Sequence, residues 1–438
     1  MNNIVGENFP LTRAARKQKL DEVKKGSSIS TKKVPGKGTM SVFRIPLNCL
    51  SYNPHNTRFL SHAKTLERRF GQELNDESSE HIQEIEKVIW SEKEDRNEAT
   101  IDSLIKNGQI DPGVVTADGI VLSGNRRFRL LNEIIRNPDK YSSSRNSTAG
   151  LNFFEAVILD EENLSKRDIV RYESFYQFGI EEKVEYNPIQ KYIAAKDQKG
   201  LGFSEQEIAN NFITITKGKK SEVEKWLKVY DLMTEYLDHI GEDGIFTALE
   251  GREEAFLRLL NDLKSFKGAK GAKMWAFSED DLSSLKLIFF DFIRLNIPTH
   301  DFRLFKNIFS DESQWKEFEK NVEKVASEVS DKLESFEEYR QKNSEESEAV
   351  VSKIRQCDYI DLAEKKLNRL YGVEKARDTA KTANEEPIEI LNSIKVKLSK
   401  LEEKLNSSKD IRSYQTDEFA GAVRELQRRI GKIKQQID

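Results

Sequence analysis

Two adjacent arginines at the start of a short helix are the residues of this chain best suited to chemistry. Residues 121–131 read Val-Leu-Ser-Gly-Asn-Arg-Arg-Phe-Arg-Leu-Leu, so a strand ends in a glycine turn and a helix follows. The first turn of a helix presents unpaired backbone N–H groups and a partial positive charge. Gly124 lets the backbone approach a bound group closely, and Arg126 and Arg127 add donors suited to phosphate oxygens. The pattern predicts an anion site, most suitably for a phosphate chain; the alternative is a surface turn with two solvated arginines.

Short strands and helices around this turn are expected to form an α+β domain over residues 41–160. Alternating apolar residues indicate the strands, and Asp118-Gly119 is a hairpin-turn dipeptide between two of them. Asp111 and Asp118 flank these strands, where they either close turns or hold Mg²⁺. The expected elements are strands at 41–47, 111–116, 120–122 and 152–159, a loop at 53–58, and helices at 63–91, 99–106 and 128–135.

After residue 160 the chain is expected to be almost wholly helical, with a helix-turn-helix inside residues 161–240. Ser204–Glu207 and Ser221–Glu224 each show the Ser-x-x-Glu pattern of a capping box, which opens a helix. Glutamates in the first turn of the second helix repel phosphates, so sequence-specific DNA reading, non-specific contact and a structural role all stay open. The lysines suited to DNA phosphates are Lys217, Lys219, Lys220, Lys225 and Lys228.

Helices rich in Phe and Leu are expected over residues 241–310, and charged helices over residues 311–438. Near the C-terminus, apolar residues recur at alternating intervals of three and four, which is heptad spacing. This pattern predicts an antiparallel hairpin or a dimerising coiled coil, and therefore a homo-oligomer or a partner protein. The two seams are Leu391, Ile394, Leu398, Leu401 and Leu405, then Phe419, Val423, Leu426, Ile430, Ile433 and Ile437.

Residues 1–40 are expected to be a flexible basic arm, with one short helix between Leu11 and Val23. Basic residues outnumber acidic ones in this stretch, and Gly and Pro interrupt it. Such an arm either contacts phosphates without sequence preference or remains a solvated tail.

The overall composition is that of a charged, helix-rich protein with hydrophobic cores. Of 438 residues, 71 are Lys or Arg and 75 are Asp or Glu, and the formal net charge of -4 excludes a strongly basic, histone-like binder. The 2 cysteines and 5 histidines are scattered, which excludes a disulfide framework and argues against a zinc enzyme. No apolar run reaches the ~20 residues of a membrane span, and no secretory signal is recognisable. A cytoplasmic protein without a membrane partner is therefore expected.

Four motifs follow one another in a recognisable order. Asn53–Arg58 is a turn-rich loop, Ile105–Val115 is a helix end followed by Gly-x-x-x-Pro and a strand, and Ser123–Arg129 is the glycine–arginine turn. Arg171–Phe175 precedes a helix that begins with Pro188. Together with the helix-turn-helix that follows, they resemble the ParB/sulfiredoxin superfamily, in particular the N-terminal domain of ParB-like proteins. The resemblance extends over residues 41–237.

The resemblance implies an α+β ParB/sulfiredoxin-like domain, followed by an all-α helix-turn-helix region and a C-terminal helical or coiled-coil region. It implies binding of CTP or ATP, with Mg²⁺, and a nucleotide-dependent association with DNA. Glu173 matches the third-box Glu and is implied as the catalytic acid that orients Mg²⁺ or water; no metal ligand is assigned. The implied nucleotide-binding and phosphate-binding residues are Thr57, Arg58, Gly124, Asn125, Arg126 and Arg127.

Departures from the family pattern bear on turnover. Asn125 stands where the second box has Glu, and Ser174 stands where the third box has Asn. Cys49 lies outside the turn that carries the catalytic thiol in sulfiredoxins, so sulfiredoxin chemistry is not expected. Nucleotide binding with weak or absent hydrolysis is the resulting expectation.

The leading hypothesis is a ParB-like nucleotide-binding, DNA-associated protein in which the nucleotide switches DNA binding or self-association. One alternative is a ParB-like nuclease or NTPase of a plasmid, phage or phage-defence system, so enzymatic activity stays an open question. A second alternative is a non-catalytic helical scaffold. His55 either contacts the nucleotide or acts as a base, or it is a loop histidine that hydrogen-bonds the backbone. Lys183 and Tyr186 either reach the nucleotide site or are an ordinary surface lysine and a half-buried tyrosine.

Overall fold

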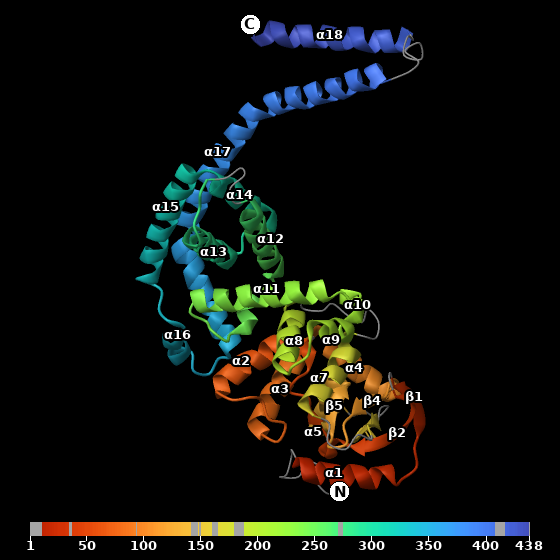
Figure 1. Ribbon diagram of the computed structural model, residues 1–438. Coiled ribbons are helices and arrows are strands. Elements are labelled where there is room, and N and C mark those ends of the chain that lie inside the picture. The colour runs from red at the N-terminus through yellow and green to blue at the C-terminus, as the bar shows by residue number, and fades with distance from the viewer. Residues whose placement is uncertain are drawn as a thin grey trace. The chain divides into compact units, whose positions relative to one another are not determined.

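The computed structural model describes residues 11–34, 37–92, 94–141, 148, 150–159, 165–178, 188–269, 275–407 and 417–437. The chain divides into two units, Met1–Asn368 and Arg369–Asp438. The first unit holds the sheet and most helices, and the second holds the end of one long helix and the last helix (Figure 1). The segment boundaries expected at residues 160, 240 and 310 therefore fall inside the first unit.

A mixed six-stranded sheet lies in the N-terminal part of the first unit, with strand order β1-β2-β6-β4-β5-β3. β4 runs parallel to β6 and β3 runs parallel to β5, while the other neighbours are antiparallel. This mixture of strands and helices, followed by a mostly helical remainder, confirms the coarse fold expected from the sequence. The strands are β1 Ser30–Val34, β2 Gly38–Pro46, β3 Ser51–Tyr52, β4 Gly113–Val115, β5 Ile120–Ser123 and β6 Phe153–Ile158.

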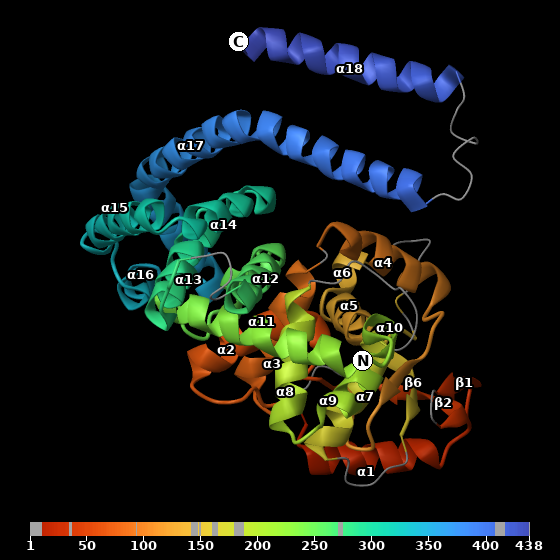
Figure 2. The same ribbon diagram turned by 45° about the horizontal axis from the view of Figure 1, so that its top comes forward.

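Two hydrophobic clusters cover the two faces of this sheet. Val115 of β4 belongs to one cluster together with Phe128 of α5, whereas the adjacent Val114 belongs to the other together with Tyr172 of α7. Successive side chains of a strand point to opposite faces, which explains why β4 and β5 are continuously apolar. α4, α5 and α6 lie side by side over the sheet domain (Figure 2). The helices of this region are α1 Arg13–Lys24, α2 Leu60–Phe70, α3 Ser79–Ser91, α4 Glu94–Asn107, α5 Asn125–Arg136, α6 Pro138–Tyr141 and α7 Lys166–Phe178.

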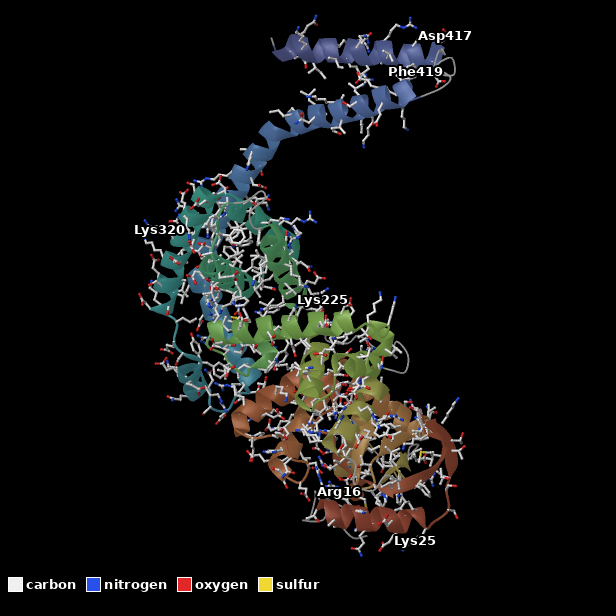
Figure 3. All side chains as sticks on the ribbon, in the orientation of Figure 1. Arg16, Lys25, Lys225, Lys320, Asp417 and Phe419 are labelled. Atoms are coloured by element: carbon white, nitrogen blue, oxygen red, sulfur yellow. The ribbon has the colours of Figure 1, made fainter. Side chains whose placement is uncertain are left out.

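The expectation of a flexible arm over residues 1–40 is wrong for residues 13–24 and 30–34, which form α1 and the edge strand β1, and for residues 38–40, which begin β2. Arg16 on α1 is completely buried, forms an ion pair with the buried Asp76, and donates from Nε to the carbonyl oxygen of Asp118 at 2.9 Å (Figure 3). A buried ion pair of this kind holds α1 against the domain, because removing either partner would leave an uncompensated buried charge. The short helix expected between Leu11 and Val23 is confirmed, and residues 1–10 lie outside the described part.

A group of four helices, α8 to α11, follows the sheet domain. Ser204 caps α9 with a complete capping box, as expected. The second expected capping box is wrong, because α11 begins at Lys220 with Lys219 as its N-cap, and Ser221 lies inside the helix. Lys217 and the following glycine both have positive φ, so the turn ends earlier than the capping pattern implied. The helices are α8 Ile189–Gly200, α9 Glu205–Asn211, α10 Ile213–Thr216 and α11 Lys220–His239.

The remaining helices of the first unit bury many aromatic rings. Phe289 and Phe302 stack with their ring centroids 4.5 Å apart, and Phe305 packs 5.0 Å from Phe289. The first turns of α17 belong to this core, because Arg355 forms a buried 2.9 Å ion pair with Glu242. The helices are α12 Glu253–Ala269, α13 Glu279–Arg294, α14 Arg303–Ser310, α15 Glu312–Ser330, α16 Phe336–Lys342 and α17 Glu348–Ser407.

Both expected heptad seams lie on helices of the second unit, within α17 and within α18, Asp417–Ile437. Several of their apolar residues are exposed, including Leu391 at 46%, Ile430 at 44% and Ile433 at 42%. The pairing of the seams stays a prediction. Among the described residues, no helix combines the length and apolar character that crossing a bilayer requires.

Candidate nucleotide site

The aromatic ring of Phe154, on β6, shapes the turn that precedes α5. Gly124 is the N-cap of α5 with φ 103°, and a Cβ at this position would lie 2.8 Å from Cζ of Phe154. A Cβ on Gly113, at the start of β4, would lie 2.4 Å from the same ring. Side chains do not approach that closely, so both positions require glycine. The ring therefore packs against the start of β4 and against the glycine–arginine turn at once.

Asn125 connects this turn to the upstream loop. Its side-chain amide donates from Nδ2 to the carbonyl oxygen of Val121 at 2.8 Å, and its Oδ1 accepts from the backbone N–H of Asn53 at 3.3 Å. The side chain is buried and points into the domain. Asn125 thus fixes the loop, and only its backbone N–H is placed at the start of α5, where a ligand would bind.

Glu173 on α7 holds the same loop from the other side. The carboxylate is completely buried, accepting from Nδ2 of Asn53 at 3.0 Å and from the backbone N–H of Thr57 at 3.3 Å. The loop, the turn and α7, distant in sequence, therefore meet through these hydrogen bonds. A carboxylate engaged in this way is suited to positioning the loop, whereas the catalytic role expected for Glu173 requires a group that reaches Mg²⁺ or water.

Three guanidinium groups gather where α5 begins. Arg126 donates from Nη2 to Oδ1 of the buried Asn97 at 3.0 Å, and Nη2 of Arg127 lies 3.3 Å from Oδ2 of Asp111. Arg58, from the upstream loop, is exposed. Partial burial is the main cause that lowers the pKa of Arg126 and of Arg127, and the nearby positive charge of Arg58 lowers both pKa values further. Acidic neighbours act in the opposite direction, because Glu92 and Asp95 raise the pKa of Arg126 and Asp111 raises that of Arg127.

A second set of buried hydrogen bonds connects α7 to α8 and α9. Ser174, adjacent to Glu173, accepts through its Oγ from Nε2 of Gln198 on α8 at 2.8 Å. Oε1 of Gln198 accepts in turn from Nδ2 of Asn211, the last residue of α9, at 2.7 Å. Ser174 and Gln198 are completely buried. These buried hydrogen bonds join the three helices, since leaving any of the buried polar groups unpaired is costly.

Four of the five lysines expected to contact DNA are exposed in and after the turn that precedes α11: Lys217, Lys219, Lys220 and Lys228. Lys225 lies on α11 (Figure 3) and is half-buried. Nζ of Lys220 lies 3.3 Å from Oε1 of Glu224, with which it forms an ion pair. Beside these lysines, α10 exposes two apolar side chains that the sequence did not single out, Ile213 at 51% and Ile215 at 44%. The turn thus presents both positive charge and apolar surface.

Two further residues singled out in the sequence have definite surroundings, His55 and Asp118. Burial is the main cause that lowers the pKa of His55 to about 4, so its imidazole is neutral at pH 7. Asp118 accepts from Oγ1 of Thr116 and closes the turn before Gly119, in keeping with the turn role of Asp-Gly. Lys183 and Tyr186 lie outside the described residues.

A pocket of about 380 Å³ lies elsewhere, between α2, α3 and the segment that leads into α17, and none of its lining residues comes from the glycine–arginine turn. Nowhere in the described ranges do three or more His, Cys, Asp or Glu side chains gather as a metal site would require.

Phe154 and Asn97 were missed by the sequence reasoning, although each contacts a motif residue. Phe154 lies in an ordinary apolar strand between the third and fourth motifs, and Asn97 lies in the charged segment between the loop at 53–58 and the motif at 105–115. Neither position carries a local signal, because each acquires its role through contacts with distant segments. Among family models, curated proteins and solved structures, none matches this chain.

Proposed function

We propose that this chain binds a nucleoside triphosphate, CTP or ATP, at the N-terminus of α5 and that the bound nucleotide governs association with DNA. The proposal joins the resemblance to ParB-like domains with the geometry of the turn. The observation that carries it is the convergence of the loop at 53–58, the turn at Gly124 and the helix bearing Glu173 around three arginines.

Each element of the turn has a distinct part in binding. The backbone N–H groups at the start of α5 donate to phosphate oxygens, and the glycine at its N-cap permits a close approach. Arg126, Arg127 and Arg58 supply charge and donors for a triphosphate. Asn125 and Glu173 do not touch the ligand but hold the loop that carries Arg58.

Binding without rapid hydrolysis follows from the same arrangement. The position of the second-box Glu is occupied by Asn125, whose side chain is used internally. Glu173 is completely buried and holds the loop. Neither group is placed to activate a water molecule, so the chain acts as a binder whose state depends on occupancy.

DNA association is assigned to the helix-turn-helix. Its lysines neutralise phosphates, a contribution that depends on salt and not on sequence. The chain of hydrogen bonds from Ser174 through Gln198 to Asn211 supports a link between the nucleotide loop and α9. Self-association through the heptad seams of α17 and α18 is the further expected partner interaction.

Titration of CTP and of ATP, each with Mg²⁺, into the wild-type chain and Arg126→Ala tests the proposal. Loss of charge-assisted hydrogen bonds is expected to weaken binding about tenfold to a hundredfold. Arg303→Ala is the matched control, because Arg303 is an exposed arginine on α14. Absence of binding to both nucleotides, or equal affinities for the two variants, would overturn the proposal.

A further inference from the structure

An aspartate lies between two cations beside the glycine–arginine turn. Oδ2 of Asp111 is 3.3 Å from Nη2 of Arg127, and its Oδ1 is 2.5 Å from Nζ of Lys32. Lys32 belongs to β1, the edge strand formed by the segment expected to be a flexible arm. One carboxylate therefore bridges the start of α5 and a strand distant from it in sequence.

This bridge has the geometry of a phosphate subsite. Two oxygens of one anion each contact a different cation, as two oxygens of a phosphate group would. The cations are ordered, since Lys32 also donates to the carbonyl oxygen of Pro112 at 2.5 Å and its side chain is only 20% exposed. The Asp111 side chain, by contrast, is 60% exposed to solvent.

Arg127 has donor capacity beyond its contact with Asp111. Its side chain is 22% exposed. Its Nη1 is buried, and within the described part of the chain it meets no hydrogen-bond acceptor. A buried guanidinium N–H without an acceptor is unfavourable, so a ligand oxygen at this position would relieve the cost. The bridge thus combines an exposed, replaceable anion with cations that are already in place.

We propose that Asp111 is the internal anion of this site, which a phosphate group of the nucleotide displaces, and that Lys32 then becomes a phosphate ligand. The inference rests on the proposed function and adds Lys32 and Asp111 to it. Displacement is favoured because the Asp111 side chain is 60% exposed and the freed carboxylate regains water, while the two less exposed cations keep an anionic partner. A phosphate group carries more negative charge than a carboxylate, and so replaces it on the same two cations.

The test uses titration of CTP, ATP and inorganic tripolyphosphate into the full chain, once with Mg²⁺ and once with EDTA. Asp111→Asn removes the competing anion and is expected to tighten binding about two- to fivefold in both conditions. Lys32→Gln is expected to weaken binding at least about fivefold, with recovery in Lys32→Arg. Lys33→Gln is the matched control, because Lys33 is exposed on the same strand and its side chain points to the other face.

The results for the Asp111 and Lys32 variants test this inference separately from the proposed function. Weaker binding by Asp111→Asn with Mg²⁺ alone would identify Asp111 as a metal ligand and overturn the inference. Equal effects of Lys32→Gln and Lys33→Gln would remove Lys32 from the site and overturn it as well. In both cases nucleotide binding by the wild type would leave the proposed function standing, whereas a wild type that binds none of the three probes refutes both. Thermal unfolding of every variant verifies that the fold is retained.

Discussion

Replacement of Glu173 by glutamine distinguishes a residue that holds the loop from one that performs chemistry. In the folded chain the carboxylate accepts from Nδ2 of Asn53 at 3.0 Å and from the N–H of Thr57 at 3.3 Å, with no exposure to solvent. The carbonyl oxygen of a glutamine at this position can accept from only one of these two donors. Its NH₂ group, itself a donor, would face the other one. One buried donor is left unsatisfied, at a cost of about 1–3 kcal/mol.

The loss of charge assistance adds to that cost, so Glu173→Gln is expected to lower the free energy of unfolding by about 2–4 kcal/mol in total. Urea unfolding followed by circular dichroism measures this difference. Glu254→Gln is the matched control, since Glu254 is an exposed glutamate on α12 and its replacement should change stability by less than about 0.5 kcal/mol. Nucleotide affinity should fall together with stability, because the loop bearing Arg58 loses its anchor.

A different result would refute the positional role of Glu173. An acid held in place for chemistry leaves stability unchanged, or even raised, when it is replaced, while activity is lost. If Glu173→Gln were as stable as the wild type and bound nucleotide normally, the loop would not depend on this carboxylate. If hydrolysis alone disappeared, Glu173 would be a catalytic residue, contrary to its burial.

Two further predictions concern pH and DNA. The folded-state pKa of His55 is depressed to about 4 from an ordinary value of 6.5. As the pH falls, the imidazole is protonated in the unfolded chain before it is protonated in the folded chain. The free energy of unfolding therefore decreases as the pH falls from about 6.5 to about 4. Since this side chain is half-buried, urea unfolding should show about 1–3 kcal/mol less pH dependence in His55→Gln over that window; identical pH profiles would contradict the burial of a neutral imidazole. For DNA, replacing Lys219 and Lys220 by Gln should weaken binding to any duplex and reduce the slope of log K against log salt by about 2, as fluorescence anisotropy would show. An unchanged slope would place the DNA contact elsewhere.

Local patterns predicted several elements because their causes are local. The Ser-x-x-Glu box at Ser204 opens α9, since both partners of the capping hydrogen bonds lie within one turn. The turn before α5 was likewise predicted correctly, from its glycine and from the helical pattern that follows. The second Ser-x-x-Glu pattern failed because Lys217 and Gly218 adopt positive φ and start α11 before Ser221.

Residues 13–34 show where composition misleads. A basic segment with Gly and Pro resembles a solvated tail, yet Arg16 is completely buried because Asp76, sixty residues later in the chain, supplies its counter-charge. Lys32 becomes ordered by a similar long-range contact with Asp111. Neither partner is identifiable from spacing, since ion pairs between distant segments leave no periodic pattern.

The sequence by itself determined the strand–turn–helix with its arginines, the order of the motifs and the helical character of the C-terminal half, because backbone preferences and apolar periodicity act over a few residues. Only the tertiary structure decided what surrounds the arginines. It directed the side chains of Asn125 and Glu173 inward to hold the loop, and it brought Lys32 and Asp111 to the turn. The reason is physical: a buried polar group takes whichever partner the fold brings within hydrogen-bonding distance, and that partner is set by packing across the whole domain.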